Sequence, residues 1–161
     1  SEFDISDARI KPKPRVPIPM LVGGRSDAAI ERAAKHSEGW IGVWCSSKRY
    51  SEALDILHGK AEAFGRSAVD WCHGYQPWIG IDRRDSNKAR AAVEKGMESF
   101  YKIPFSKFER YTPFGTPSEV AEQLVPYVES GCRLFNLKVC TSKPEEEIEL
   151  GAEVVALLRK I

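Results

Sequence analysis

The sequence predicts an α/β protein with a parallel sheet, and three features of the pattern predict it. Short apolar runs alternate four times with stretches of amphipathic helical periodicity. Capping residues precede several of the helical stretches, and glycines follow several of them. Such alternation is typical of parallel strands joined by right-handed crossovers. A complete (β/α)8 barrel needs about 250 residues and this chain has 161, so two architectures stay open: a small open sheet with helices on both faces, or half of a barrel.

The first two strand–helix units follow from local signals. Residues 20–22 form the first apolar run, and Ser26 caps a helix that ends near residue 37. Residues 40–44 form the second apolar run. The helix after it ends at Gly65. Its apolar stripe consists of Tyr50, Leu54, Leu57, Ala61 and Phe64, one residue for each helical turn or so.

The third unit begins with an apolar run at residues 78–81. A helix follows over about residues 87–101, and residues 102–114 are rich in aromatic residues and proline, which predicts an irregular segment. The buried face of this helix is predicted to carry Ala89, Val93, Met97 and Phe100.

The fourth unit begins with a complete helix-start signal. Thr116, Pro117 and Glu119 supply an N-cap, a proline at the first helical position and the acidic residue of a capping box. Residues 134–139 form the fourth apolar run. Ser142 and Glu145 predict a second capping box for the last helix, whose inward face is predicted to carry Ile148, Ala152 and Val155.

Composition and charge exclude several classes of protein. Hydrophobic residues make up 42% and charged residues 29% of the chain, which excludes disordered and fibrous classes. The formal net charge of +1 argues against a nucleic-acid binder, since such proteins carry a basic excess. No apolar run approaches the roughly 20 residues of a membrane span, and no signal sequence opens the chain. We therefore expect no nucleic-acid or membrane partner and a cytoplasmic location.

The cysteines and histidines predict no metal site. No two of the four cysteines form a CxxC pair, and the three histidines are scattered, whereas zinc sites use closely spaced ligands. A domain with this apolar content does not need disulfides. We therefore expect reduced, structural thiols at Cys45, Cys72, Cys132 and Cys140.

The turn after the first strand has the features of a phosphate-binding loop. Gly23 and Gly24 let a bound group approach the backbone without a Cβ in its path. The N–H groups of the helix start then point at that group, while Ser26 can donate its hydroxyl and Arg25 can add charge. The loop matches neither GxxxxGK(S/T) nor GxGxxG, so a nucleoside triphosphate or dinucleotide is not indicated. The residues leave a second interpretation open, a tight turn in which Ser26 only caps the helix.

Residues 44–48 form a second polar cluster, at the end of the second strand. Ligands bind at the carboxyl ends of parallel strands, so Trp44 can form a wall for a planar ring and Lys48 can meet an anion. The alternative is that Trp44 belongs to the core and Lys48 is solvated, and for Lys48 we expect the solvated state. The acidic residues 145–147 are expected to be a solvated helix start. No serine lies in a GxSxG motif and no cysteine has a partner histidine and carboxylate in a known motif. The sequence therefore assigns no catalytic residue.

Short motifs along nearly the whole chain occur in an order and spacing that resemble a known family. They are Phe3-Asp4, Asp7-Ala8-Arg9, Lys11-Pro12-Lys13-Pro14, Pro17-Ile18-Pro19-Met20-Leu21-Val22-Gly23-Gly24-Arg25-Ser26, Ala29, Ala33-Ala34, Gly39-Trp40-Ile41, Gly115-Thr116-Pro117-Ser118-Glu119-Val120 and Gly131-Cys132-Arg133-Leu134-Phe135-Asn136-Leu137. No single motif is unique, but together they resemble the luciferase-like monooxygenase family. Its members are flavin- or deazaflavin-dependent oxidoreductases on a (β/α)8 barrel.

The resemblance covers only the second half of the family's barrel. It implies that residues 1–161 form one half-barrel domain, strands five to eight, with residues 1–19 as a proline-rich hairpin that leads into strand five. In the family the loop after strand five holds the cofactor phosphate. The resemblance assigns that role to four consecutive residues here, Gly23, Gly24, Arg25 and Ser26. It also places Trp44 near the flavin pocket. The implied cofactor is FMN or the deazaflavin coenzyme F420, and the implied partner is a small-molecule substrate.

Three functions are compatible with these observations. The chain contributes the phosphate loop of a flavin-dependent monooxygenase or oxidoreductase and is inactive as an isolated half. Alternatively it is a non-catalytic flavin-binding relative, a kind of protein that the family includes, or a self-assembling half-barrel that serves as a binding module. A half-barrel leaves residues 20–22 and 134–139 as unpaired strand edges, so we expect a homo-oligomer.

Overall fold

The computed structural model describes Arg9 and residues 11–161, and every strand pairing within them is parallel. The strands are β1 (Leu21–Gly23), β2 (Gly39–Gly42), β3 (His73–Tyr75), β4 (Trp78–Ile81), β5 (Phe114–Gly115), β6 (Cys132–Phe135) and β7 (Lys138–Cys140). The helices are α1 (Asp27–His36), α2 (Ser47–Ala63), α3 (Ser86–Tyr101), α4 (Pro117–Glu129) and α5 (Glu147–Leu158). The predicted fold class is confirmed, and the parallel βαβ arrangement is consistent with part of a (β/α)8 barrel.

Two of the strand positions are interrupted. The predicted fourth strand is divided into β6 and β7, and β3, which was not predicted, precedes β4. β1, β2, β3 and β6 are neighbours in one sheet, and β4 lies between β5 and β7 in the other. The N–H of Asn136 donates to the Tyr75 carbonyl and that of Lys138 to the Pro77 carbonyl, both at 3.0 Å, so pairing continues across the interruptions. Pro77 has no N–H for the ladder, which accounts for the break between β3 and β4.

The first two units form as predicted, with shifted ends. The Ser26 side chain accepts a hydrogen bond from the Ala29 N–H at 3.2 Å, which confirms the predicted cap of α1. β1 covers Leu21–Gly23 rather than residues 20–22, and β2 ends at Gly42, so that Trp44 lies beyond the strand. Phe64 was wrongly predicted as part of the buried stripe of α2. It is 41% exposed because the helix ends one residue before it.

α3 buries three of the four side chains predicted for its inner face. The fourth, Phe100, is 65% exposed, and its ring lies beside that of Trp78 with the centroids 5.7 Å apart. Residues 102–113 are irregular as predicted and contain the 3-10 turns η1 (Phe105–Lys107) and η2 (Glu109–Tyr111), whereas residue 114 begins β5, which was not predicted. The buried residues of α3 are Ala89, Val93 and Met97.

α4 begins as predicted, whereas α5 does not. Thr116 and Glu119 form the predicted capping box of α4. No side-chain hydrogen bond caps α5 or the turn η3 (Pro144–Glu146) before it, so the second predicted capping box is wrong. The predicted inward face of α5 is also wrong, since Ile148 is 88% exposed. A Cβ on Gly151 would lie only 3.1 Å from Cγ2 of Val139, so this glycine selects the face that packs on the sheet. The buried residues of α5 are Leu150, Gly151, Val154 and Leu158.

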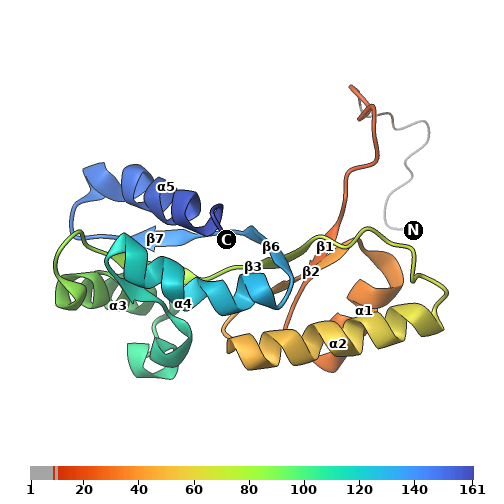
Figure 1. Cartoon of the computed structure of the whole chain (residues 1–161), viewed down its shortest axis with the longest axis horizontal. Helices are drawn as coiled ribbons and strands as arrows, with labels where there is room; N and C mark the ends of the chain where they lie inside the picture. The colour runs from red at the N-terminus through yellow and green to blue at the C-terminus, as the bar shows by residue number, and fades with distance from the viewer. Residues whose placement is uncertain (1–8, 10) are drawn as a thin grey trace, which may run out of the picture.

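The first two helices start at the same end of the sheet. β1 and β2 pair in parallel, with Leu21 opposite Gly39 and Gly23 opposite Ile41, so their carboxyl ends lie together. Figure 1 shows α1 and α2 packed side by side next to these strands. The loop before α1 and the loop before α2 therefore begin next to each other.

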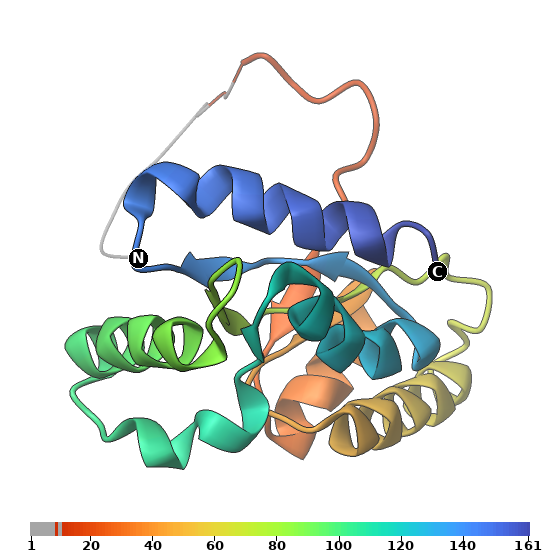
Figure 2. The same ribbon diagram turned by 60° about the vertical axis from the view of Figure 1, so that its left-hand side comes forward.

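The two outer strand positions each have an unpaired edge in the described part of the chain. There, β1 pairs with β2 alone, and β6 with β3 alone. Residues 11–20 lead into β1 as an exposed segment without helix or strand, which stands away from the body of the molecule in Figures 1 and 2. Val16, Ile18 and Met20 in this segment are 71%, 70% and 61% exposed. The remainder of the predicted hairpin, residues 1–8 and 10, lies outside the described residues.

Candidate functional site

The loop between β1 and α1 depends on a glycine conformation. Gly24 has a φ of +128°, and a Cβ on it would lie 2.8 Å from the Ala29 Cβ. Only glycine adopts this backbone without strain. The Ser26 hydroxyl oxygen accepts from the Ala29 N–H, which leaves its proton for another group. The loop thereby presents the positive end of the α1 dipole at the carboxyl end of the sheet.

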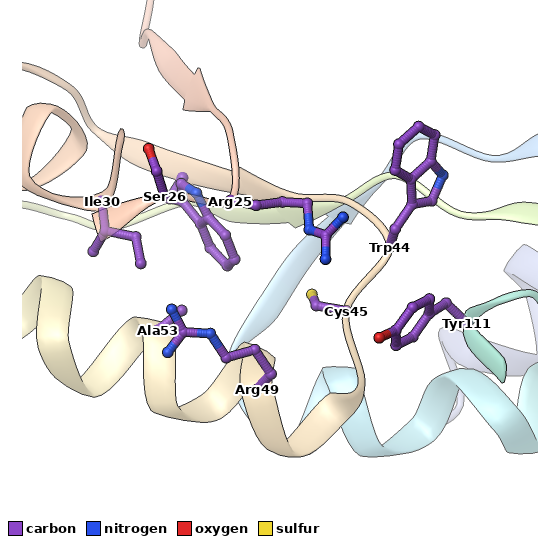
Figure 3. Close-up of a pocket in the computed structure, with 9 residues that line it drawn as sticks. Arg25, Ser26, Ile30, Trp44, Cys45, Arg49, Ala53 and Tyr111 are labelled. Carbon is purple, nitrogen blue, oxygen red and sulfur yellow. The ribbon is translucent and has the colours of Figure 1, made fainter. Parts of the chain in front are cut away.

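A cavity of about 380 Å³ opens beside this loop. Its walls come from three parts of the chain: the start of α1, the end of β2 with the first turns of α2, and the end of the irregular segment (Figure 3). Its volume is within the usual range for small-ligand sites. The lining residues are Arg25, Ser26, Ile30, Trp40, Trp44, Cys45, Arg49, Ala53 and Tyr111. The cavity therefore joins three of the five predicted site residues, and Gly23 and Gly24 supply the backbone just before them.

Two guanidinium groups give the cavity its charge. Arg25 approaches it from the loop before α1 and Arg49 from the first turn of α2 (Figure 3), and none of its nine lining residues is acidic. Nη2 of Arg49 lies 3.3 Å from Oδ1 of Asp27, whose side chain is 79% exposed. Such an exposed ion pair contributes little and can be exchanged for another anion. Guanidinium groups match the geometry of phosphate oxygens, so the cavity suits a phosphate ester.

The thiol of Cys45 in the wall of the cavity is not activated. Burial raises the pKa of this thiol to about 11, although the positive charges of Arg25 and Arg49 act in the opposite direction. The thiol is therefore neutral near pH 7 and is a poor nucleophile. Cys45 acts as a small apolar part of the wall.

Trp44 lies at the edge of the cavity in a strained turn. Its φ is +46°, which is unusual for a bulky residue. Its ring packs against those of Tyr101 and Phe108, with centroid distances of 4.9 Å to each. Strained backbone of this kind persists only where its surroundings hold it, and it is concentrated at functional sites. Lys48 is exposed, as predicted.

Arg49 and Tyr111 were not predicted as site residues from the sequence. Arg49 follows the α2 cap by three residues, and the Ser46 side chain accepts its N–H at 3.2 Å. A cation in the first turn of a helix that follows a strand of the same sheet is a signal that marks both Lys48 and Arg49 and does not choose between them. Tyr111 comes from an irregular segment, where no periodicity indicates a direction.

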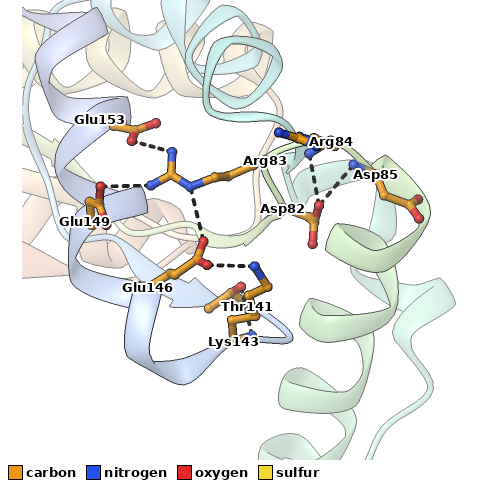
Figure 4. A network of polar contacts seen from close by, with 9 residues as sticks. All are labelled: Asp82, Arg83, Arg84, Asp85, Thr141, Lys143, Glu146, Glu149 and Glu153. Carbon is orange, nitrogen blue, oxygen red and sulfur yellow. Dashed lines mark hydrogen bonds and ion pairs between the residues drawn. The ribbon is translucent and has the colours of Figure 1, made fainter.

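A network of ion pairs around Arg83, just after β4, is structural (Figure 4). The Arg83 guanidinium contacts Glu146, Glu149 and Glu153 at 3.2, 3.0 and 2.7 Å. Hydrogen bonds, first from Lys143 and then from Arg83, lower the pKa of the Glu146 carboxyl. Glu146 is therefore paired, which corrects the expectation that the acidic run is only a solvated helix start. The cluster ties the β4–α3 loop to α5.

A grouped metal-binding site and a membrane-spanning helix are both absent from the part of the chain that the structure describes. Over Arg9 and residues 11–161, no three or more His, Cys, Asp or Glu side chains are grouped so as to hold a metal ion. Over the same residues, no helix combines the length and apolar character that crossing a membrane requires. All four cysteines are free thiols.

Comparison of the sequence with known proteins finds only short matches to uncharacterized proteins. No known protein-family profile matches the chain. A stretch of 39 residues is 49% identical to part of an uncharacterized protein of Mycobacterium tuberculosis, and an equivalent protein of Mycobacterium bovis matches equally. That stretch is 24% of this chain and 13% of the relative.

Comparison by structure finds many proteins with the same fold. An F420-dependent secondary alcohol dehydrogenase, solved with an F420-acetone adduct, superposes with a TM-score of 0.79 at 16% identity, over 98% of this chain and 54% of its own. An F420-dependent tetrahydromethanopterin reductase from Methanopyrus kandleri gives 0.66 at 18% identity, over 86% and 50%. The EDTA monooxygenase of Chelativorans sp. BNC1 gives 0.67 at 16%, over 92% and 46%. The chain thus spans about half the length of the structures that it matches, and identities this low show the fold alone.

Proposed function

We propose that this chain, which has the luciferase-like monooxygenase fold, is the part of a flavin-type oxidoreductase that binds the phosphate of the cofactor. The observation that carries the proposal is the cavity at the start of α1, with two guanidinium groups and no acidic residue in its wall. In this proposal Gly23, Gly24, Arg25 and Ser26 hold the phosphate ester. Trp44 closes the side from which the rest of the cofactor leaves, and Arg49 supplies a second positive charge.

The proposal covers FMN and the deazaflavin coenzyme F420, because both carry a phosphate ester that this cavity accepts. When bound, such a cofactor supplies electron or hydride transfer to a small-molecule substrate. The residues of this chain bind and orient the phosphate. None of the nine lining residues is a carboxylate or a histidine, and the Cys45 thiol is neutral. We therefore assign no proton transfer to this chain and expect it to bind without turnover.

The lack of a carboxylate or a histidine in the cavity wall also favours a second candidate, a non-catalytic flavin-binding protein. The two candidates differ in what the complete protein does with reduced cofactor. Substrate-dependent oxidation of reduced FMN or F420 supports the oxidoreductase, whereas binding without any oxidation above the buffer rate supports the second candidate.

Arg49→Gln is expected to weaken phosphate binding about tenfold, because the variant loses one charge-assisted hydrogen bond in a partly exposed site. Titration of the 15N-labelled chain with inorganic phosphate measures the effect through the amide shifts of the loop before α1. Lys48→Gln is the matched control, since Lys48 is the neighbouring cation on the same helix and does not line the cavity. We expect less than a twofold change there. An equal loss in both variants, or amide shifts that map elsewhere, would refute the site.

We also propose that the isolated chain self-associates through its open edges. A groove between α5 and the edge of β6 and β7 is lined mainly by apolar side chains, including Phe135, Leu137 and Ile148. An exposed parallel edge and an apolar groove are usually covered by a partner. A second half-barrel related by a twofold axis along the strands would pair each free edge with a parallel strand.

Light scattering is expected to show a dimer at micromolar concentration. Ile148→Glu should convert it into a monomer, because this change places a charge in the groove at a side chain that is 88% exposed. Ile56→Glu, at a 37% exposed position of α2, is the matched control and should remain dimeric. A monomeric parent chain, or an Ile148→Glu variant that stays dimeric, would exclude this interface.

A further inference from the structure

The two loops that line the cavity are held by hydrogen bonds from the buried core. Nε1 of Trp40, on β2, donates to the Gly24 carbonyl at 2.8 Å. The hydroxyls of Tyr127, on α4, and Tyr75, on β3, donate to the Cys45 carbonyl at 2.6 and 3.1 Å. We infer that Trp40, Tyr75 and Tyr127 are positioning residues for the phosphate site, an inference that rests on the proposed function.

Fixing these two carbonyls fixes the N–H groups that follow them. In a trans peptide the C=O and the next N–H point in opposite directions. The bond to the Gly24 carbonyl therefore sets the direction of the Arg25 N–H, at the residue that lines the cavity. The bonds to the Cys45 carbonyl set the direction of the Ser46 N–H in the same way. Ser46 then caps α2, so the orientation of this peptide also determines where Arg49 lies.

The turn at Trp44 needs such a support. Its φ of +46° is unfavourable for a tryptophan, and the carbonyl that the two tyrosines hold belongs to the next residue. Burial raises the pKa of Tyr127 to about 12, so its hydroxyl stays protonated and remains a donor near neutral pH. A chain without the Tyr127 hydroxyl is expected to relax this turn and to move the first turn of α2 away from the cavity.

Two other hydrogen bonds in the core serve as controls, because they do not end on the loops that line the cavity. The Tyr50 hydroxyl donates to the Gly74 carbonyl at 3.2 Å, and Nε1 of Trp78 donates to the Tyr101 hydroxyl at 3.0 Å. Tyr50 and Trp78 are as buried as Tyr127 and Trp40, with exposures between 0% and 7% for the four side chains. Neither of these two bonds reaches a residue that lines the cavity. Their loss removes a buried hydrogen bond of a similar kind without removing any hydrogen bond that ends on the two loops.

The experiment compares four variants of the 161-residue chain. Tyr127→Phe and Trp40→Phe are titrated with inorganic phosphate by 1H–15N NMR beside Tyr50→Phe and Trp78→Phe. We expect the phosphate Kd to rise at least fivefold in the first two variants and less than twofold in the two controls, with a similar fall in Tm in all four. Without phosphate, the heteronuclear NOE should fall at Ser46 in Tyr127→Phe and at Arg25 in Trp40→Phe.

Two results would overturn the inference while leaving the proposed function intact. One is the same phosphate Kd for the parent chain and for Tyr127→Phe and Trp40→Phe. The other is the same loss in all four variants, which would indicate general loosening of the core. A parent chain that binds no phosphate at all would overturn the proposed function and the inference together.

Discussion

Gly24→Val is expected to abolish phosphate binding and to lower the free energy of unfolding by about 3 kcal/mol. A β-branched residue does not adopt the φ of +128° at this position without strain. Its Cβ would also lie 2.8 Å from the Ala29 Cβ, in the first turn of α1. The loop must therefore move, and the N–H groups of Arg25 and Ser26 move with it. Binding is lost because the backbone is displaced, and not because a side chain blocks the anion.

Phosphate titration and urea unfolding measure both effects on the same sample. Gly65→Val is the matched control, because Gly65 also has a positive φ, +69°, but does not line the cavity, and a Cβ on it would meet nothing within 4 Å. We expect this control to bind phosphate within twofold of the parent chain. Tight binding by Gly24→Val would exclude the loop as the binding element. Equal losses of binding in the two variants would point to general destabilisation of the fold.

The starts of α1 and α4 could be predicted from the sequence because neighbouring residues decide them. Ser26 and Thr116 cap the helices that their positions indicated. The division of two strands could not be predicted in the same way, since it depends on which residues pair across the sheet. The buried face of α5 could not be predicted from the sequence for another reason. Its sequence carries two apolar stripes, and the close contact of Gly151 with Val139 selects between them.

The candidate site could be predicted only where one loop carries all of the signal. Arg25 and Ser26 belong to a single strand–loop–helix segment, so their neighbourhood is visible in the sequence. Lys48 and Arg49 are adjacent cations in the first turn of α2, and no local signal says which of them is solvated. The packing of α2 beside α1 turns Arg49 toward the cavity and leaves Lys48 exposed. Contacts of this kind exist only once the tertiary structure has formed.

Acid is expected to destabilise the protein through His73, by about 2 kcal/mol between pH 7 and pH 5. His73 is 3% exposed, and its Nδ1 accepts the Trp40 N–H at 3.2 Å. Its proton therefore lies on Nε2, which has no hydrogen-bond partner within the described residues. Its ring is stacked on that of Trp71, over which Arg66 lies, and it meets the edge of the His58 ring, so none of these contacts supplies an anion to pair with an added proton.

Burial, with a smaller effect of His58, lowers the pKa of His73 to about 4, from an ordinary value of 6.5. Between these two values the unfolded chain binds a proton that the folded chain does not, so the free energy of unfolding falls as the pH falls. Urea unfolding at pH 7, 6 and 5 measures this slope. In His73→Asn the side-chain oxygen can still accept the Trp40 N–H but does not titrate, so we expect most of the slope to disappear. An unchanged slope in His73→Asn would assign the acid sensitivity to other groups.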